Sequence, residues 1–492
     1  MASNHSSLHG LIGALALVLT GVVRAAAGME PTQPELASHT PNGEPTQGIC
    51  FLPTLSPTGR FTAFTCYSFD ILPGEPGVGD GLMHDATVDS IIGLSYDEEG
   101  KWAHCGNAEL GTCTSRTIAI ETNGAHVVMN SAAPLVSEAP FPTPDAGSPE
   151  VYLRDIAARL TTWLTPTPPN AASLHFPVGR DVSFDRSELL YRSAGNEIGG
   201  PDENGYFVAD LFVKNWLSGH VELISTSLSG GQGNASTTAE ASFSPDGRYV
   251  VFISRASNLT SDNPLGWNNL FLRDRVLGTT RRLTFPAGVG EFTAHPTFAS
   301  QPVITSDNRY VLFALVGAQL VEDEDPNVPL SVYEIDLQTG QTRLISRGVN
   351  DEPLNASAFG ASFSDDGRYM AFETAATNVS EDPGPLPGVF VRDRLTGETI
   401  NVSEALGMAP HTLPGHVTLS ADGSTVAFAW PKWNATYPTL LDNQQIYKVR
   451  LRGDLPPVDS VAVPVASRHA LGLLVLLLSL AALLAARTTQ QW

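Results

Sequence analysis

A nine-residue pattern, Ser-x-Asp-Gly-Arg-Tyr-x-x-Phe, recurs seven times along the chain and constrains its fold more than any other feature. The clearest copy is Ser244–Phe252, which reads Ser-Pro-Asp-Gly-Arg-Tyr-Val-Val-Phe. Alignment of the copies on their last residue gives one column that contains Phe64, Met129, Tyr191, Phe252, Phe313, Phe372 and Phe428. Self-similarity at a regular spacing is typical of repeat architectures. We therefore expect seven copies of one supersecondary unit.

Each copy predicts a hairpin turn followed by a strand. Asp in the turn bonds local backbone groups, and Gly supplies the positive φ at its end. Gly occupies that place in five copies, Asn308 replaces it in the fifth copy, and Arg186 breaks the pattern in the third. The following residues are strand formers, as in Tyr249–Ile253, and their near-continuous apolarity indicates a strand buried on both faces.

A second apolar strand, a tight turn and a further strand follow each copy. In the fourth unit, Leu270–Asp274 leads through Gly278 to Thr280–Thr284. Each unit therefore contains about four strands, and such a sheet buries both faces only when units stack radially. The sequence predicts an all-β fold, a seven-bladed β-propeller with four-stranded antiparallel blades, over residues 48–455.

The repeat also carries a family resemblance. The Ser-Pro-Asp-Gly-Arg-Tyr at 244–249, with Phe-Leu-Arg-Asp at 271–274 and Arg-Arg-Leu-Thr at 281–284, resembles the TolB-like, WD-type propeller repeats of bacterial envelope proteins. The resemblance covers about 400 residues, but it lies in turn and core positions, so it implies a fold and says little about function. TolB has an α/β domain before its propeller, whereas roughly 20 residues are available here, so the Tol-Pal role is not carried over.

The charge balance excludes one class of partner. The chain has 51 Asp and Glu against 28 Lys and Arg, which gives a formal net charge of -23. Such a chain has no basic footprint for nucleic acid and repels phosphates. Its 42% of hydrophobic residues, with only 16% charged, is enough for a sizeable core. We expect a globular, monomeric propeller that does not bind nucleic acid.

The N-terminal residues 1–27 resemble an export signal. An apolar run, Leu11–Val23, is followed by Ala25-Ala26-Ala27 as a cleavage site, although the first ten residues contain no Lys or Arg. A buried or membrane-spanning helix is the alternative. Residues 28–47 form an N-terminal extension. The last repeat lacks a clear fourth strand, and we expect this extension to supply it, with Val458–Val463 as the rival.

The C-terminal residues 470–492 predict a membrane or sorting segment. Ala470–Ala486 is an apolar run at the lower length limit for a membrane helix, and a Pro-rich spacer, residues 456–469, precedes it. Pro464, the short apolar run and Arg487 resemble the bacterial IPTL-CTERM and PEP-CTERM sorting tails. The tail is either a processed sorting signal or a simple anchor. Both place the protein outside the cytoplasm, in the periplasm, in the outer envelope or at the cell surface.

Four cysteines in an exported chain indicate two disulfides. Cys50 and Cys66 lie almost symmetrically about the turn at 56–59, so we expect them to pair across neighbouring strands. Cys105 and Cys113 then close a small loop. The alternative is a metal site that recruits His104, but the Cys-x7-Cys spacing is uncommon for zinc.

The loops between the second and third strands are long and acidic, with about one acidic loop in each unit. Calcium is the cofactor that they suggest, and the candidate ligands are Asp202, Glu203, Asp323, Asp325 and Asp382. Ordinary solvation of exposed loops is the alternative, and we favour it because no loop has the EF-hand pattern. Three loop tryptophans either stack on sugars or pack against the rim: Trp267, Trp430 and Trp433.

No enzyme signature is present in the sequence. It contains no Gly-x-Ser-x-Gly elbow, no His-x-His and no His-Glu-x-x-His, and we therefore interpret each histidine, including His84 and His416, as an ordinary surface or core residue. The sequence predicts a non-catalytic scaffold that is anchored in the envelope and binds a protein or a glycan through its acidic loops. A propeller hydrolase or lyase that acts on carbohydrate is the alternative, and a structural surface-coat protein is a third class.

Overall fold

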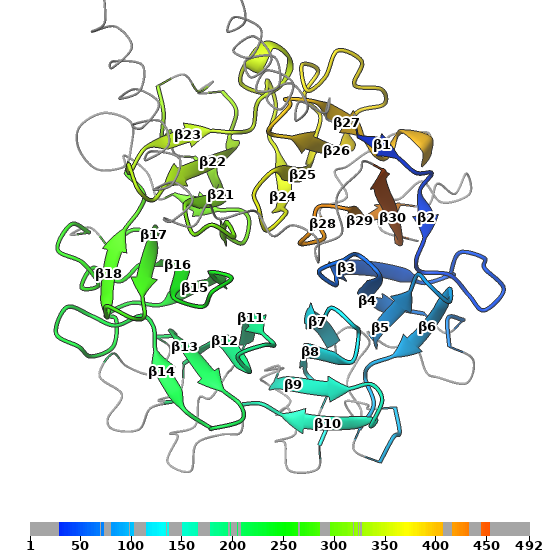
Figure 1. Cartoon of the computed structure of the whole chain (residues 1–492), viewed down its shortest axis with the longest axis horizontal. Coiled ribbons are helices and arrows are strands. Elements are labelled where there is room, and N and C mark those ends of the chain that lie inside the picture. Colours follow the sequence, from blue (N-terminus) through cyan, green and yellow to red (C-terminus); the bar gives the residue numbers. More distant parts are fainter. Residues whose placement is uncertain are drawn as a thin grey trace, which may run out of the picture. The chain divides into compact units, whose positions relative to one another are not determined.

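The structure, a computed structural model, describes residues 29–68, 70–72, 80–97, 99–102, 115–133, 135–136, 150–165, 178–194, 197, 204, 208–263, 266–285, 296–317, 319–322, 324, 327–406, 416–431 and 444–452. All of them belong to the first of two units into which the chain divides, Met1–Gly453 and Asp454–Trp492. The first unit contains seven antiparallel sheets arranged as blades around a central axis (Figure 1). The predicted seven-bladed β-propeller is confirmed.

The strands follow chain order within each blade, from the innermost to the outermost, except that two strands from the N-terminus form the outer edge of blade 7. Blade 1 comprises β3 (Ile49–Leu55), β4 (Phe61–Tyr67), β5 (Asp80–Asp85) and β6 (Ser90–Gly93), and blade 2 comprises β7 (Ser115–Ile120), β8 (His126–Ser131), β9 (Glu150–Asp155) and β10 (Leu160–Trp163). Blade 3 comprises β11 (Val178–Ser183), β12 (Glu188–Ser193), β13 (Asp210–Asn215) and β14 (Val221–Leu223). Blade 4 comprises β15 (Thr237–Phe243), β16 (Tyr249–Ser254), β17 (Asn269–Asp274) and β18 (Thr279–Arg282).

The remaining blades keep this order, with two short 3-10 helices, η1 (Val349–Asp351) and η2 (Glu404–Leu406), between strands. Blade 5 comprises β19 (Thr297–Phe298), β20 (Val303–Ile304), β21 (Tyr310–Val316), β22 (Leu330–Asp336) and β23 (Thr342–Leu344). Blade 6 comprises β24 (Phe359–Phe363), β25 (Tyr369–Thr374), β26 (Gly388–Asp393) and β27 (Thr399–Asn401). Blade 7 comprises β28 (Val417–Leu419), β29 (Thr425–Pro431) and β30 (Gln444–Arg452), with β1 (Glu30–Pro31) and β2 (Glu35–Leu36).

The repeated aromatic column lies in the second strand of every blade, and each member of it is buried. Successive residues of such a strand point to opposite faces of the sheet. In β16, Val250 and Phe252 pack toward blade 3, whereas Val251 and Ile253 pack toward blade 5. The continuous apolar run is therefore explained by the two neighbouring blades that it contacts.

The Asp-Gly turns have the conformation that the pattern predicts. Gly247 has φ +68°, the left-handed conformation that favours glycine, and a Cβ there would lie 2.2 Å from the guanidinium of Arg186, which would have to move. Asn308 takes the same left-handed conformation with φ 57°. In the third copy the positive φ belongs to Ser187, one residue after Arg186. The left-handed position of this turn is therefore displaced by one residue along the chain.

A repeated ion pair connects the two hairpins of four blades. The Arg that follows the turn glycine, or Asn308 in blade 5, binds the Asp that ends the third strand. The pairs are Arg60–Asp85, Arg248–Asp274, Arg309–Asp336 and Arg368–Asp393. The hydrogen bonds from the Arg side chains help to lower the pKa of all four carboxyl groups. The Gly-Arg-Tyr and Arg-Asp motifs are thus two halves of one contact.

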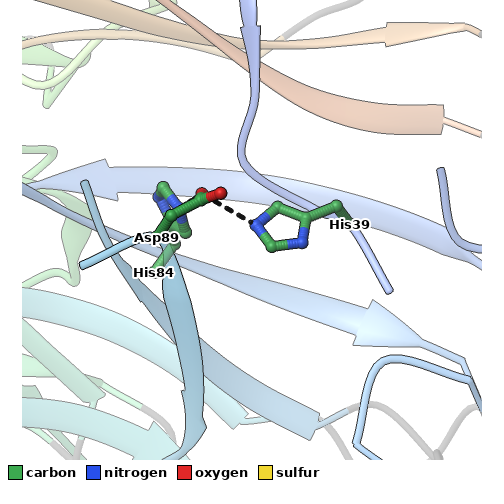
Figure 2. Close-up of side chains that lie close together, drawn as sticks. All are labelled: His39, His84 and Asp89. Carbon is green, nitrogen blue, oxygen red and sulfur yellow. Dashed lines mark hydrogen bonds and ion pairs between the residues drawn. The ribbon is translucent and has the colours of Figure 1, made fainter. Parts of the chain in front are cut away.

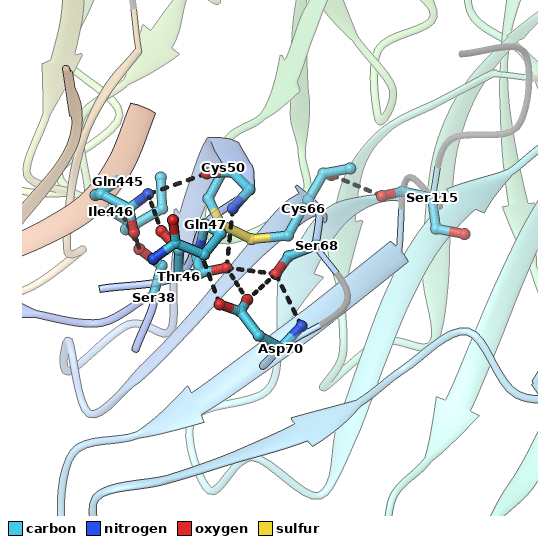
Figure 3. The surroundings of a disulfide bond; sticks show 12 residues. Ser38, Thr46, Gln47, Cys50, Cys66, Ser68, Asp70, Ser115, Gln445 and Ile446 are labelled. Atoms are coloured by element: carbon cyan, nitrogen blue, oxygen red, sulfur yellow. Dashed lines mark hydrogen bonds between the residues drawn. A yellow bond between two sulfur atoms is a disulfide. The ribbon is translucent and has the colours of Figure 1, made fainter. Parts of the chain in front are cut away.

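The N-terminal extension closes the ring. Both β1 and β2 pair with β30 of blade 7, as predicted, whereas the rival Val458–Val463 lies outside the described residues. Ser38 adds a side-chain hydrogen bond to Gln445, and its hydroxyl also accepts from the backbone N–H of Ile446 (Figure 3). The first and last parts of the described chain therefore share one sheet.

One predicted disulfide is confirmed. Cys50 of β3 and Cys66 of β4 are directly paired in the strand register and joined by a disulfide (Figure 3). Thr46, Ser68 and Asp70 form a hydrogen-bonded cluster beside it. The other pair, Cys105 and Cys113, lies outside the described residues, as do the predicted signal and C-terminal segments. Within the described residues, no helix has the length and apolarity that a membrane span requires.

Candidate functional site

The centre of the propeller holds a cavity of about 600 Å³, which we call the channel pocket. The innermost strands surround it (Figure 1). Every blade contributes lining residues: Leu52, Pro53, Thr54; Arg116, Thr117, Ile118, Asn130; Val178, Gly179; Glu240; Phe298, Ala299, Ser300, Gln301; Gly360, Ala361, Ser362; and His416, Val417, Thr418. The pocket combines an arginine, a histidine and a carboxylate with hydroxyl and amide groups.

Irregular backbone shapes this pocket. The innermost strands of blades 1, 2, 3, 4 and 6 all have a register shift beside their second strand, and in blade 5 this strand is split into β19 and β20. Leu52 and Gly360 lie at two of these shifts with φ 55° and 60°. A β-bulge re-aims a side chain and interrupts pairing. The pocket therefore depends on residues at which the repeat is broken.

Part of the pocket lining lies near the side from which the second-to-third loops leave, which we call the loop side. Arg116 pairs with Asn130, and Val178 pairs with Arg192. Both partners are close to the ends of their second strands, where these loops begin. The opposite end, where the Asp-Gly turns lie, is the turn side. Part of the channel pocket and the predicted acidic loops thus share one side of the propeller.

Four ionisable groups gather at the loop side. Arg116 of β7 and Arg192 of β12 both interact electrostatically with Glu240 of β15. Burial lowers the pKa of both guanidinium groups, and Glu240 raises it, so both remain charged. Burial, and then Arg116, lower the pKa of His416, which keeps this imidazole neutral near pH 7. The local charge is therefore positive in a strongly acidic chain.

The two arginines of this group differ in their contacts. The Nε of Arg192 donates to the backbone carbonyl of Thr237 at 2.9 Å. Within the described residues, the guanidinium of Arg116 donates no hydrogen bond. A guanidinium offers five N–H donors in a planar fork that matches a carboxylate. Arg116 is thus the group in the pocket that is best suited to bind an anionic ligand.

The turn side of the channel has the opposite charge. Burial raises the pKa of Asp181 to about 6. Burial, and then the negative charges of Asp181, Asp366 and Asp422, raise the pKa of Asp365 to about 6. These carboxylates come from three different blades and converge because the turns meet around the axis. The channel is therefore positive at its loop side and negative at its turn side.

This convergence predicts a pH-dependent stability. The pKa of Asp365 is about 6 in the fold and about 3.9 in an unfolded chain. Its favourable contribution is therefore complete below about pH 4 and is lost as the pH rises through about 6. We expect Asp365→Asn to stabilise the protein at pH 8 by on the order of 1 kcal/mol, after allowance for screening in the channel, and to have no effect at pH 4.

Thermal unfolding at both pH values checks this expectation. Asp382→Asn is the matched control, because Asp382 is an exposed carboxylate of a blade 6 loop. It should change stability equally little at both pH values. A stabilisation by Asp365→Asn that is equal at pH 4 and pH 8 would show that repulsion between the carboxylates is not its cause.

The acidic loops are only partly as predicted. Of the proposed calcium ligands, Asp382 is exposed, and the others lie outside the described residues: Asp202, Glu203, Asp323 and Asp325. Two other loop carboxylates are engaged in the fold. Glu197 accepts hydrogen bonds from Tyr191 and Ser193, and Glu324 is buried and accepts from Tyr333. Both acids connect their loops to their blades by hydrogen bonds, and Glu324 is buried whereas Glu197 is partly exposed.

The tryptophans follow the packing alternative. Trp430 is buried, and Trp267 packs against the apolar cluster between blades 4 and 5. Trp433 lies outside the described residues. Trp430 is thus not available to stack on a sugar at the surface, whereas Trp267 is partly exposed.

One group of side chains in the described residues has the composition and spacing to hold a metal ion. It consists of His39, His84 and Asp89, and it lies at the ring closure, away from the acidic loops. The sequence pattern did not reveal this group because its members come from three separate segments without a short motif. For the same reason the sequence pattern did not reveal the grouping of Arg116, Glu240 and His416, which lie far apart in the chain and meet when the ring closes.

The comparisons with known proteins show similarity at the level of the fold. No family model matches the chain, and no curated protein does. Oligogalacturonate lyase from Vibrio parahaemolyticus is 12% identical with a TM-score of 0.49, over 86% of this chain and 98% of that chain. An oligogalacturonate lyase in complex with manganese is 11% identical with a TM-score of 0.48, over 87% and 97%.

TolB from Acinetobacter baumannii is also similar, with 14% identity and a TM-score of 0.34, over 81% of this chain and 67% of that chain. The propeller that the TolB-like repeat implied is shown by the order of the strands in the seven sheets. A lyase and TolB are among the structures that are similar to it. Identities and scores as low as these say nothing about catalysis, ligands or partners.

Proposed function

We propose that the chain is an exported, non-catalytic binding scaffold that holds an anionic group of an envelope glycan or protein in its channel pocket. The observation that carries this proposal is the guanidinium of Arg116, which is charged and without a hydrogen bond to the described residues. Binding sites on rigid scaffolds usually lie among loops, and part of the lining of this pocket lies near the loop side.

The charge of the molecule restricts the ligand further. A partner with many negative charges is repelled by a chain of net charge -23 and by exposed loop carboxylates such as Asp382. A partner with one carboxylate among hydroxyl groups meets Arg116, while Gln301, Ser300 and Thr418 offer hydrogen bonds to the hydroxyls. A glycan with an isolated acidic sugar fits this description.

Calorimetric titration with two matched disaccharides tests the proposal. Cellobiouronic acid carries one carboxylate, and cellobiose is its neutral counterpart. We expect the acid to bind more tightly and Arg116→Ala to weaken its binding by at least about tenfold, because a charge-assisted hydrogen bond is lost. Arg281→Ala, on the outer strand of blade 4, is the control. Equal affinity for both sugars, or an unchanged affinity in Arg116→Ala, contradicts the proposal.

A carbohydrate-active hydrolase or lyase is the second candidate, favoured by the combination of Arg116, Glu240 and neutral His416 in one pocket. A neutral imidazole is able to accept a proton, and an arginine stabilises developing negative charge. Among the described lining residues, however, Glu240 is the one carboxylate, whereas glycoside hydrolysis uses a pair. New reducing ends after incubation with oligouronates would establish this alternative.

The compartment belongs to the same proposal. Export is inferred from residues 1–27 and anchoring from residues 470–492. Fractionation of cells that produce the chain without its last 23 residues tests the anchor. Retention in the membrane fraction would rule out the tail as the anchor.

A further inference from the structure

Two histidines and an aspartate meet where the N-terminal extension crosses blade 1 (Figure 2). His39 follows β2, His84 belongs to β5, and Asp89 lies in the turn between β5 and β6. The Nε2 atoms of His39 and His84 lie 3.2 and 3.0 Å from the same Oδ1 of Asp89. All three ligand atoms lie within 4.8 Å of one another.

The orientation of His39 leaves this contact incomplete. Its Nδ1–H donates to the backbone carbonyl of Thr40 at 2.8 Å, so its Nε2 carries a lone pair in the neutral ring. His39 is only 8% exposed, and its Nε2 is buried without a hydrogen-bond partner. This lone pair faces a carboxylate oxygen, which is also an acceptor. Two acceptors at 3.2 Å need a cation between them.

The spacing suits a tetrahedral metal ion. Zinc binds imidazole nitrogen and carboxylate oxygen at about 2.0–2.2 Å, so neighbouring ligand atoms of a tetrahedron lie about 3.3 Å apart. The distances from Asp89 Oδ1 to the two imidazole nitrogens, 3.2 and 3.0 Å, are close to this value, and the two nitrogens lie within 4.8 Å of each other. The bond from His39 Nδ1 to a backbone carbonyl is also the second contact that metal-binding histidines usually make.

The exposure of Asp89 fits a ligand. Its side chain is 71% exposed, so a fourth position remains accessible to water. Nitrogen ligands from two imidazoles favour zinc and related transition metals over calcium, which prefers six to eight oxygens.

Lys448 is the neighbour that opposes a metal. This fully buried residue of β30 places its Nζ 3.3 Å from His84 Nδ1, on the far side of the ring from Asp89. When His84 Nε2 binds a metal, Nδ1 carries the proton and no longer accepts a bond from the ammonium. Glu35 of β2 lies 3.4 Å from Lys448 and provides the alternative acceptor and the compensating charge.

We propose that His39, His84 and Asp89 bind a divalent transition-metal ion, with zinc as the best match, and that this ion fastens the N-terminal extension to blade 1. The site is distinct from the channel pocket and from the acidic loops. Its role is structural, because His39 belongs to the segment that closes the ring, whereas His84 and Asp89 belong to the first blade.

Titration of the chelator-treated full chain with zinc chloride tests the proposal. We expect one ion per chain and a higher melting temperature in its presence. Cobalt chloride should give the visible absorption of a tetrahedral site. Asp89→Asn and His39→Ala should each weaken zinc binding by at least about tenfold. Asparagine keeps the shape of aspartate and tolerates positive φ, so the first variant is expected to fold.

His126→Ala is the matched control. His126 also lies between carboxylates, with Nδ1 2.7 Å from Glu121 and Nε2 3.6 Å from Asp155, but it has no second histidine and does not belong to the metal-spaced group. Its replacement should leave the stoichiometry and affinity unchanged. The proposal is overturned if zinc neither binds nor raises the melting temperature, or if zinc binds equally well to Asp89→Asn and His39→Ala.

Discussion

Replacement of Phe252 by alanine is expected to lower the free energy of unfolding by about 3–5 kcal/mol. Phe252 is fully buried between blades 3 and 4 and stacks on Phe271 with ring centroids 5.7 Å apart. Removal of its ring deletes the buried apolar surface and leaves a cavity that two rigid sheets are unable to fill. The loss adds a cavity term to the transfer term, which accounts for the size of the effect.

Urea unfolding followed by tryptophan fluorescence and by circular dichroism measures this loss. Leu277→Ala is the control in the same blade, because Leu277 is 66% exposed in the turn between β17 and β18. It should change stability by less than about 0.5 kcal/mol. A loss of under about 1 kcal/mol in Phe252→Ala would show that the repeated aromatic column does not hold neighbouring blades together.

Removal of the confirmed disulfide has the second largest expected effect. Cys50 and Cys66 are 16 residues apart, and a cross-link of this span stabilises a fold by about 3 kcal/mol in the chain-entropy model. The double variant Cys50→Ser, Cys66→Ser should therefore unfold at a lower urea concentration. The bond joins the first two strands of blade 1, beside Ser38 and Gln445 at the ring closure (Figure 3).

Measurements with and without reductant separate this disulfide from any other. The wild-type protein should lose stability in reductant, whereas the double variant should already have lost most of it. Equal midpoints for the oxidised wild type and the double variant would contradict the prediction. A further loss in the reduced double variant would indicate that Cys105 and Cys113 also form a bond.

The fold could be predicted from the sequence because its signals are local and repeated. Each Asp-Gly turn fixes a hairpin within nine residues, and each apolar run such as Tyr249–Ile253 reports burial on both faces. Seven copies of such a unit leave radial stacking as the arrangement that buries every sheet. The missing outer strand of blade 7 likewise predicted that the N-terminal extension would complete it.

The candidate sites could not be predicted because they depend on distant residues and on irregular backbone. Arg116 and Glu240 belong to two innermost strands, and His416 directly precedes a third. The closure of the ring brings these three residues together. His39 and His84 are neighbours only because the extension returns to blade 1. Glu324 lies in one of the acidic loops, for which the sequence favours ordinary solvation. Tyr333 donates a hydrogen bond to it inside the blade, and only the packing shows this contact.

The ring closure described above also sets an order of events during folding. Ser38 and Gln445, which share a hydrogen bond, are 407 residues apart in the chain. Contacts of such sequence separation are slow to form, because a long loop must close before they repay its entropy. We therefore expect the first six blades of a nascent chain to assemble before the N-terminal extension pairs with β30. The strand β30 is the partner of the extension, so the pairing of β1 and β2 with β30 is the last contact of the ring to form. This contact lies nearest to both ends of the described chain.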